Sequence, residues 1–481
     1  MMKKLVAVLL CCLMFSGAVA LADGIGTAQS PITVNWMNKD VTSEDADAAL
    51  VLEAIEKGMA AQGNYVDLVL LNPPAGKYVE VAPLAFRTGE INPDILFFQG
   101  NTDGPVVAEN LLENLTPYVE GSTYVKALMG EHNKARLASQ PYLLWLAPAK
   151  YSAPVIRADF LAKATSAHAF LADPTPDNYY KLLKELIDND TVKFGMTVDG
   201  GLARLDSIFN HAFGVTSTIM NVEGQWVYSM VTPQEKNKLA FYAKLYADGI
   251  LDPDYITKAW DTMEQAFYDG DAALIAGTAG DVIQVYNTKM VSLHGTESEL
   301  VALPPAKGES FAYVSIDVTK EERGFAINAT SPEEVKKAAF AVLEYMSSPE
   351  GRMLDKLGIE GTHYTLENNT VTFTDAWGGY WARFFPTVNG LPAELTYTTP
   401  VLSKPAADSL AFGQQYYAQD INVILPEELK PLYTAVKSIY TEYANEIVRG
   451  VRPVDDFAEM VEKINAAGGI QLSEYFATVL K

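Results

Sequence analysis

The chain has 481 residues, more than one typical hydrophobic core accommodates, so two domains are expected. Its 49% hydrophobic and 20% charged residues are typical of a globular protein. The formal charge of −24 argues against wrapping nucleic acid or lying on anionic lipid, because both surfaces are negatively charged. We therefore expect no nucleic-acid partner, although the total charge does not fix the charge of a particular cleft.

Residues 1–22 have the features of a signal peptide. Lys3 and Lys4 form a basic start, residues 5–15 form an apolar run, and the small-x-small sequence that ends at Ala22 is a cleavage signal. We expect an exported protein, periplasmic or at the cell surface, that is cleaved near Ala22. No later stretch reaches the length of a membrane-spanning helix.

Both cysteines of the chain, Cys11 and Cys12, lie inside the apolar run of this signal. A lipid-attachment cysteine follows small residues at the end of such a run, so we expect no lipid anchor. Without a cysteine, the mature chain cannot form a disulfide, a thiolate metal site or a cysteine nucleophile.

Strands and helices are expected to alternate after the signal peptide. Apolar runs predict strands at 31–37, 65–72 and 93–99, and helical periodicity predicts helices at 43–61 and 78–88. This alternation indicates βαβ units with a parallel sheet.

Ligands of open parallel sheets bind beyond the carboxyl ends of the strands. The polar and aromatic residues at these ends are Trp36, Asn38, Gln99 and Asn101. We therefore take these four as candidate ligand contacts.

A break in the pattern lies between residues 142 and 160. An apolar run at 142–146 predicts a buried strand, Pro148 interrupts it, and a second β-prone piece leads into a helical pattern from Arg157. We interpret this segment as the passage from one lobe to another; an edge strand with a kink is the alternative.

The alternation of helices and strands resumes after this break. A helix is predicted at 177–188 after Pro174-Thr-Pro176, and another at 233–248 that ends at Gly249. Further elements are a helix starting after Gly200-Gly201, strands at 193–198, 225–230, 272–276 and 324–328, and helices at 262–268 and 333–347.

These elements predict an α/β protein of two lobes joined by more than one passage of the chain. The first lobe takes residues 23–147 and 310–365, and the second takes residues 148–309 and 366–481. More than one connection makes a hinged pair of lobes that encloses a cleft.

Signatures of catalysis and of tightly bound cofactors are absent from the sequence. There is no HExxH, GxSxG, P-loop, dinucleotide-binding or EF-hand motif. The histidines show no metal-ligand spacing: His132, His168, His211, His294 and His363. We expect a binding protein without a cofactor or a metal, and not an enzyme. With 60 acidic residues, however, the sequence does not exclude a pair of neighbouring carboxylates of the kind that glycosidases use.

Several stretches, in order and spacing, carry a family resemblance over nearly the whole mature chain. They are NPDI at 92–95, LENLTPY at 112–118, the passage at 142–160, PTPD at 174–177, LYADGILDP at 245–253 and FYDGDAA at 267–273. Together they resemble extracellular solute-binding proteins of the family 1, sugar-binding type, the receptor components of ABC importers. The segment 347–369, with GIEGTHY at 358–364, resembles the large receptors for oligosaccharides, including alginate- and pectin-fragment binders.

The resemblance implies a two-lobed periplasmic-binding-protein-like fold, each lobe a mainly parallel sheet flanked by helices, with lobes joined by hinge crossings. It also implies a carbohydrate ligand and, as partners, the ABC transporter permease subunits in the membrane. We expect a monomer. Members of the oligosaccharide subgroup often carry a calcium loop, but residues 188–193 of this chain offer too few oxygen ligands, so we expect no calcium there.

Aromatic rings stack on the apolar faces of sugars, while amides and carboxylates bind their hydroxyl groups. The aromatic candidates are Trp36, Tyr151, Trp260, Trp377 and Trp381, of which the last two share a face if their segment is helical. Thr278 and Asp281 are polar candidates after a strand, and Arg204 is a candidate partner for the carboxylate of an acidic sugar. Core packing for the aromatic residues, and solvation for Arg204, are the alternatives.

The sequence therefore predicts capture of an oligosaccharide in a cleft between lobes and its delivery to a membrane permease. A receptor for peptides or another polar solute, and an exported polysaccharide-active enzyme, are the alternative functions.

Overall fold

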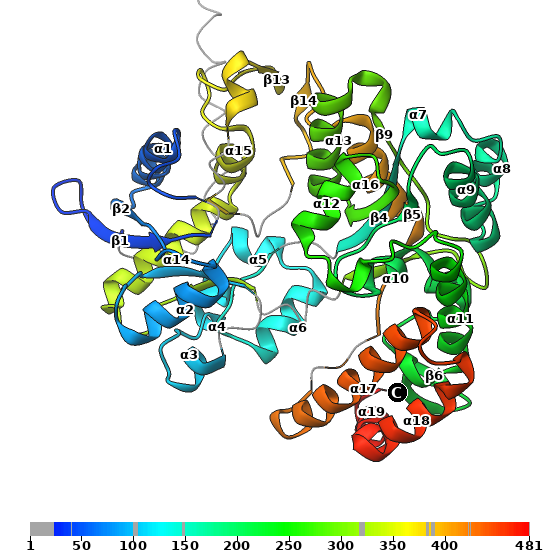
Figure 1. The fold of residues 1–481 in the computed structure, drawn as a ribbon. Coiled ribbons are helices and arrows are strands. Elements are labelled where there is room, and N and C mark those ends of the chain that lie inside the picture. The colour runs from blue at the N-terminus through cyan, green and yellow to red at the C-terminus, as the bar shows by residue number, and fades with distance from the viewer. Residues whose placement is uncertain are drawn as a thin grey trace, which may run out of the picture. The chain divides into compact units, whose positions relative to one another are not determined.

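The computed structural model describes residues 24–39, 41–99, 104–146, 150–316, 323–380, 384–385, 390–421, 423 and 425–480. These residues form two compact units (Figure 1). Unit 1 comprises the described residues of 1–148 and 319–399, and unit 2 those of 149–318 and 400–481. The chain thus passes between the units three times.

Unit 1 is built on the three strands that the sequence predicts first. The sheet order is β11–β3–β1–β2, with β1 parallel to β2 and β3, and β11 antiparallel to β3. The bounds are β1 Ile32–Met37, β2 Val66–Leu71, β3 Ile95–Phe98 and β11 Gly324–Ile327. The predicted parallel sheet is confirmed for this unit.

Helices of unit 1 bury apolar side chains against both faces of this sheet. Met37 packs with Ala82 and Phe86, while the neighbouring Trp36 points to the opposite face and contacts Phe325, as the two-residue period of a strand requires. The bounds are α1 Ala48–Ala61, α2 Tyr78–Thr88, α3 Gly104–Ala108, α4 Thr116–Gly121, α5 Tyr124–Leu128, α6 Glu131–Ser139, α14 Glu333–Ser347 and α15 Pro349–Leu357.

A small second sheet keeps residues 364–397 in unit 1. Its strands are β12 Tyr364–Glu367, β13 Thr370–Phe373 and β14 Thr396–Tyr397. Because β13 pairs with both β12 and β14, the segment 366–399 stays with unit 1, whereas the sequence analysis assigns it to the second lobe. Conversely, the segment 310–318 belongs to unit 2, because the strand that it contains pairs with the main sheet of that unit.

The main sheet of unit 2 is mixed rather than mainly parallel. Its order is β15–β10–β4–β8–β5, and β9 also pairs with β4. The bounds are β4 Lys150–Arg157, β5 Phe194–Met196, β8 Ala272–Thr278, β9 Leu300–Ala302, β10 Tyr313–Ile316 and β15 Tyr417–Ala418; a separate hairpin is formed by β6 Ile219–Val222 and β7 Gln225–Tyr228. β4 runs antiparallel to β8, β9 and β10, whereas β5 is parallel to β8 and β15 is parallel to β10.

The predicted strand at 142–146 does not form. Leu144 makes only an isolated antiparallel bridge to Phe325, and its segment packs within unit 1. Residues 143–146 are nevertheless buried, so the apolar run reports burial and not a strand. The second β-prone piece is β4, and the helix predicted from Arg157 is α7.

Helices of unit 2 begin at the signals found in the sequence. Thr175 and Thr232 each accept a backbone N–H at the start of a helix, and Pro176 and Pro233 are the first helical residues. The bounds are α7 Ala158–Leu161, α8 Ala167–Ala172, α9 Pro176–Asp188, α10 Ala203–Phe209, α11 Pro233–Ala247, α12 Trp260–Tyr268, α13 Asp281–His294, α16 Lys404–Tyr416, α17 Lys430–Val448, α18 Phe457–Ile464 and α19 Ile470–Val479.

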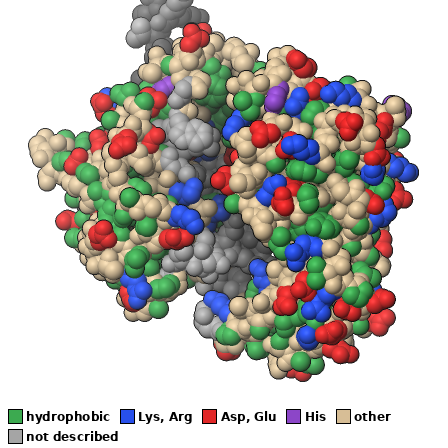
Figure 2. All heavy atoms as spheres, in the orientation of Figure 1, with side chains coloured by type: hydrophobic (Ala, Val, Ile, Leu, Met, Phe, Trp, Pro, Cys, Tyr) green, Lys and Arg blue, Asp and Glu red, His purple; other side chains and the backbone are tan. Residues whose placement is uncertain are grey.

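The helices at the end of the chain complete the core of unit 2. Figure 1 shows α17, α18 and α19 beside α11 and the β6–β7 hairpin, and residues of α17, α18 and α19 share one core with those of α9, α10 and α11. On the visible surface of each unit, acidic and basic side chains are interspersed (Figure 2). No helix among the described residues is long and apolar enough to span a membrane.

Candidate functional site

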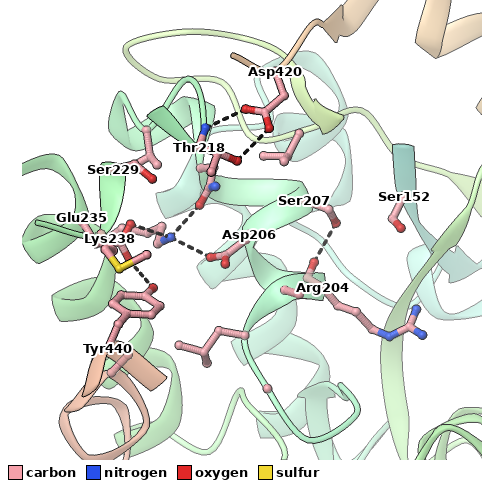
Figure 3. Close-up of a pocket in the computed structure, with 18 of the residues that line it drawn as sticks. Ser152, Arg204, Asp206, Ser207, Thr218, Ser229, Glu235, Lys238, Asp420 and Tyr440 are labelled. Carbon is pink, nitrogen blue, oxygen red and sulfur yellow. Dashed lines mark hydrogen bonds and ion pairs between the residues drawn. The ribbon is translucent and has the colours of Figure 1, made fainter. Parts of the chain in front are cut away.

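A cavity of about 730 Å³ lies within unit 2 (Figure 3). This volume is in the range of small-molecule binding sites. The wall comes from the ends of β4 and β8, from β10, from α10 and the segment after it, from α11 and the turn before it, from the start of α12, and from the C-terminal segment with α17. The polar and aromatic residues of the lining include Ser152, Asp199, Arg204, Asp206, Asn210, His211, Ser217, Thr218, Glu235, Lys238, Trp260, Thr278, Asp420, Tyr433, Lys437 and Tyr440.

One side of the cavity is a stack of Trp260 on Arg204. The guanidinium carbon of Arg204 lies 4.4 Å from the centroid of the Trp260 ring. The same guanidinium donates from Nε to Asp199 Oδ1 at 2.5 Å, from Nη2 to Asp199 Oδ2 at 3.3 Å, and from Nη1 to the carbonyl of Ala276. Arg204 is therefore held by Asp199 along one edge and by the Ala276 carbonyl at Nη1, and its flat face supports the indole ring.

Trp260 is the first residue of α12 and remains 45% exposed. The Glu264 carboxyl, one helical turn later, lies beside the indole and beside Tyr286. Burial raises the pKa of Glu264, and the neighbouring Tyr286 and Trp260 side chains act in the opposite direction. A large ring that is fixed on one side and exposed on the other presents an apolar surface to a ligand.

Hydroxyl groups stand at the strand ends beside this stack. Ser152 of β4 and Thr278 of β8 are directly paired across the sheet, both are partly exposed, and both line the cavity. They supply donors and acceptors of the kind that bind the hydroxyl groups of a polar ligand.

The inner wall holds a buried ion network centred on Lys238 (Figure 3). Its Nζ, on a side chain 1% exposed, lies 2.7 Å from Asp206 Oδ1, 2.9 Å from Glu235 Oε2 and 2.6 Å from Asn210 Oδ1. Burial by itself would lower the pKa of Lys238, but the two carboxylates outweigh it and raise that pKa. Lys238 is therefore charged, as a buried lysine with two acidic partners is expected to be.

Two tyrosines close the Lys238 network. The Tyr440 hydroxyl of α17 donates to Glu235 Oε1 at 2.6 Å, and the Tyr242 hydroxyl donates to Asp206 Oδ1 at 3.0 Å. Burial raises the pKa of Glu235, while Lys238 opposes this shift. The network ties α10, α11 and α17 together around the cavity.

Asp420 stands at a further part of the wall, in the segment that precedes α17. Its Oδ1 accepts from Ser217 Oγ at 2.7 Å and from the Thr218 N–H at 2.6 Å, and its Oδ2 accepts from Thr218 Oγ1 at 2.7 Å. These donors are all neutral, so they satisfy the carboxylate without cancelling its charge.

The sequence profile of the family described as bacterial extracellular solute-binding protein matches residues 40–353. The chain belongs to this family. No curated protein sequence matches the chain at significant similarity.

Solved structures share the fold of this solute-binding protein at low sequence identity. Alginate-binding protein AlgQ2 without calcium ion is 16% identical with a TM-score of 0.66, covering 94% of this chain and 98% of that chain. An extracellular solute-binding protein from Bifidobacterium longum subsp. infantis is 12% identical, with a TM-score of 0.66 and coverage of 93% and 98%. The S. pneumoniae ABC-transporter substrate binding protein FusA in complex with kestose is 14% identical, with a TM-score of 0.63 and coverage of 92% and 97%. The predicted family is confirmed by the sequence profile, and the predicted α/β fold is confirmed by these likenesses, apart from the mixed sheet of unit 2.

Three residues singled out in the sequence of this solute-binding protein come together at the cavity: Arg204, Trp260 and Thr278. Trp260 begins α12, whereas the sequence analysis places it just before that helix. Asp281, at the start of α13, is exposed and does not line the cavity. Arg204 is already ion-paired with Asp199, so its predicted role as the partner of an acidic sugar would compete with an ion pair of the chain itself.

Three other candidates are buried, which corrects their assignment as ligand contacts. Trp36 is 0% exposed and packs against Phe325 and Phe384 in the core of unit 1. Asn38 is also 0% exposed, and its amide donates to the carbonyl of Phe384 at 2.7 Å. Tyr151 stacks on Tyr313 with ring centroids 4.9 Å apart.

The remaining candidates belong to unit 1. Gln99 follows β3 and is partly exposed. Trp377 stacks on Phe373 at 4.0 Å, within a 3₁₀ turn at Asp375–Gly379 that is too short to test a shared helical face with Trp381. Asn101 and Trp381 lie outside the described residues.

The Lys238 network and Asp420 are not among the residues predicted from the sequence. One signal was available in α11: Glu235 and Lys238 lie on the same face as the buried Leu239, Tyr242 and Leu245. A Glu and a Lys three residues apart on an apolar helix face predict a buried ion pair. No local signal predicts Asp420, whose partners lie about 200 residues earlier in the chain.

No group of three or more His, Cys, Asp or Glu side chains that could hold a metal ion occurs in the part of the chain that the structure describes. In the segment 188–193, Asp188 pairs with Lys184 of α9, and Asn189 Oδ1 accepts from Thr191 Oγ1 at 2.6 Å. The absence of calcium here stays a prediction.

Proposed function

We propose that this solute-binding protein captures a carbohydrate, an oligosaccharide, outside the cytoplasm and delivers it to the permease subunits of an ABC importer. Membership of the extracellular solute-binding family supports a receptor role and export. Among proteins that share the fold, one is named for binding alginate and another was solved with kestose. We further propose that the protein acts as a monomer, binds without cofactor and leaves its ligand chemically unchanged.

The observation that carries the carbohydrate assignment is the exposed Trp260 ring beside hydroxyl-bearing strand ends. The ring lies on Arg204 and is fixed before any ligand arrives, so little conformational entropy is lost when a flat ligand stacks on it. Thr278 and Ser152 line the same cavity and can exchange hydrogen bonds with hydroxyl groups. An apolar platform rimmed by hydroxyl groups matches the two kinds of surface that a sugar presents.

A thermal-shift screen followed by calorimetry tests this proposal. The mature protein is heated with a panel of oligosaccharides of two to six units, and with tri- and tetrapeptides as the competing class. A ligand that binds only the folded state raises the melting temperature in proportion to the logarithm of its concentration. We expect the largest shift from an oligosaccharide, and recovery of that oligosaccharide intact after prolonged incubation.

A shift from the peptides alone would favour a peptide receptor, and release of shorter sugars would favour an enzyme. The closure of two lobes about a hinge also stays a prediction, which small-angle scattering tests by a smaller radius of gyration with ligand than without it.

A further inference from the structure

We infer that the cavity of unit 2 selects a neutral oligosaccharide and discriminates against oligomers of uronic acids. The inference rests on the proposed function and deepens it by naming the charge of the ligand. Its basis is that the buried and half-buried cations at the cavity are already neutralised by carboxylates of the same chain. A carboxylate on a ligand would lose hydration on entering the cavity, and it needs a cation or several donors in return.

Arg204 is the cation nearest to the proposed sugar platform, and three of its five N–H groups are bonded within the chain. Both carboxylate oxygens of Asp199 accept from one edge of the guanidinium, and the carbonyl of Ala276 accepts from Nη1. The side chain is only 12% exposed, and Trp260 lies over its face. Asp199 therefore occupies the Nε–Nη2 edge, one of the two edges along which arginine binds a carboxylate in two-pronged geometry, and it neutralises the guanidinium charge.

Lys238 offers no excess positive charge either. It has two carboxylate partners, Asp206 and Glu235, so its network carries a net charge of zero or −1, depending on whether Glu235 is protonated. The three protons of its ammonium group face three acceptors of the chain, since Asn210 is the third.

Two further groups that could carry positive charge are weak attractors. His211 is buried, and burial lowers the pKa of its imidazole, which keeps the ring neutral near pH 7. Lys437 is exposed on α17, with Nζ 5.8 Å from the centroid of the Tyr433 ring. A charge in contact with bulk water is screened and contributes little to an ion pair.

Asp420 makes the electrostatic balance of the described cavity wall unfavourable for anions. Its carboxylate is bonded by Ser217 and Thr218, which are neutral. Among the described residues, no lysine or arginine forms an ion pair with the Asp420 carboxylate. A uronate in the cavity would meet this charge, whereas neutral hydroxyl groups would meet an acceptor.

The test compares matched neutral and acidic ligands on the intact mature protein. Oligouronates of three and four units, alginate- and pectin-derived, are measured beside their carboxyl-reduced counterparts and beside neutral oligosaccharides of equal length, at 20 and 150 mM salt. We expect the tightest ligand to be neutral, and each uronate to bind at least about tenfold more weakly than its reduced counterpart where that counterpart binds. A uronate that binds more tightly than every neutral sugar would overturn the inference and leave the proposed function standing. Absence of binding by any sugar would overturn both.

Removing Asp199 tests the physical cause. In Asp199→Asn the side chain can still accept from Arg204, but it no longer neutralises the guanidinium. We expect the ratio of uronate affinity to neutral-sugar affinity to rise at least about tenfold. Asp188→Asn is the matched control, because it makes the same change of side chain and total charge at an exposed pair on α9, outside the cavity lining.

An equal change in both variants, or no change in a folded Asp199→Asn, would contradict the proposed cause. If Asp199→Asn does not fold, Asp420→Asn replaces it, with the same direction expected because it removes negative charge from the wall. The wild-type comparison decides the inference whether or not either variant folds.

Discussion

Replacement of Trp260 by alanine should weaken ligand binding roughly 10- to 100-fold. A tryptophan side chain presents about 250 Å², and Trp260 is 45% exposed. About 110 Å² is therefore open, and a ligand that covers half to all of it gains roughly 1.4–2.8 kcal/mol at about 25 cal/mol per Å². This gain corresponds to the stated range in dissociation constant. Calorimetric titration with the tightest ligand of the screen measures it.

The control for this variant is Trp226→Ala in β7. Trp226 is partly buried against the core of unit 2 but does not line the cavity. We expect it to lower the melting temperature and to leave the dissociation constant of the folded protein unchanged. If Trp260→Ala binds as the wild type does, or if both variants lose affinity in parallel with stability, Trp260 is not the platform.

Three further predictions concern stability and processing. Lys238→Met should destabilise unit 2 by about 3–5 kcal/mol, because the buried Glu235 and the partly buried Asp206 lose their cation, whereas the exposed Lys437→Met should change the free energy of unfolding by less than about 0.5 kcal/mol; urea unfolding measures both, and equal effects would contradict the network. Hydrogen bonds from Ser166 and Thr165 lower the pKa of Glu185 to about 2. Because this pKa is about 4.3 in an unfolded chain, the ionised Glu185 stabilises the fold above about pH 5. This contribution is lost as the pH falls towards 2. Glu185→Gln should therefore be less stable than the wild type at pH 7 and equal to it near pH 2, and a difference that does not depend on pH would refute this assignment. Finally, the mature chain should begin at Asp23 without an acyl group, and an intact mass that includes a lipidated cysteine would contradict the predicted cleavage.

Much of the fold could be predicted because its signals are local. The Thr-Pro pairs at 175–176 and 232–233 begin α9 and α11, since the threonine caps the helix and the proline needs no hydrogen-bond partner. Strand partners are a different matter. Whether an apolar run such as 142–146 becomes a strand depends on a neighbour about 180 residues later, and no local pattern encodes that neighbour.

The candidate site was predictable where residue type and position agree. Trp260, at the start of a helix, and Thr278, at the end of a strand, lie where open sheets bind ligands. Trp36 and Tyr151 also lie in strands, but each points to a covered face, against Phe325 and Tyr313 respectively. Aromatic character alone does not distinguish a platform from a core residue, because both functions use the same large apolar surface.

The Lys238 network and the bonds of Asp420, which no local pattern predicts, are completed by residues near the end of the chain. Tyr440 of α17 donates to Glu235 of α11, and Asp420 binds Ser217 and Thr218 of the segment that leads into β6. Along the chain, the partners in these bonds are separated by residues 319–399, which belong to unit 1. The cavity wall therefore depends on contacts whose partners are about 200 residues apart in sequence, and its charge balance is a property of the folded unit rather than of any one motif. For the same reason, ligand charge is better inferred from which carboxylate each cation meets than from the −24 of the whole chain.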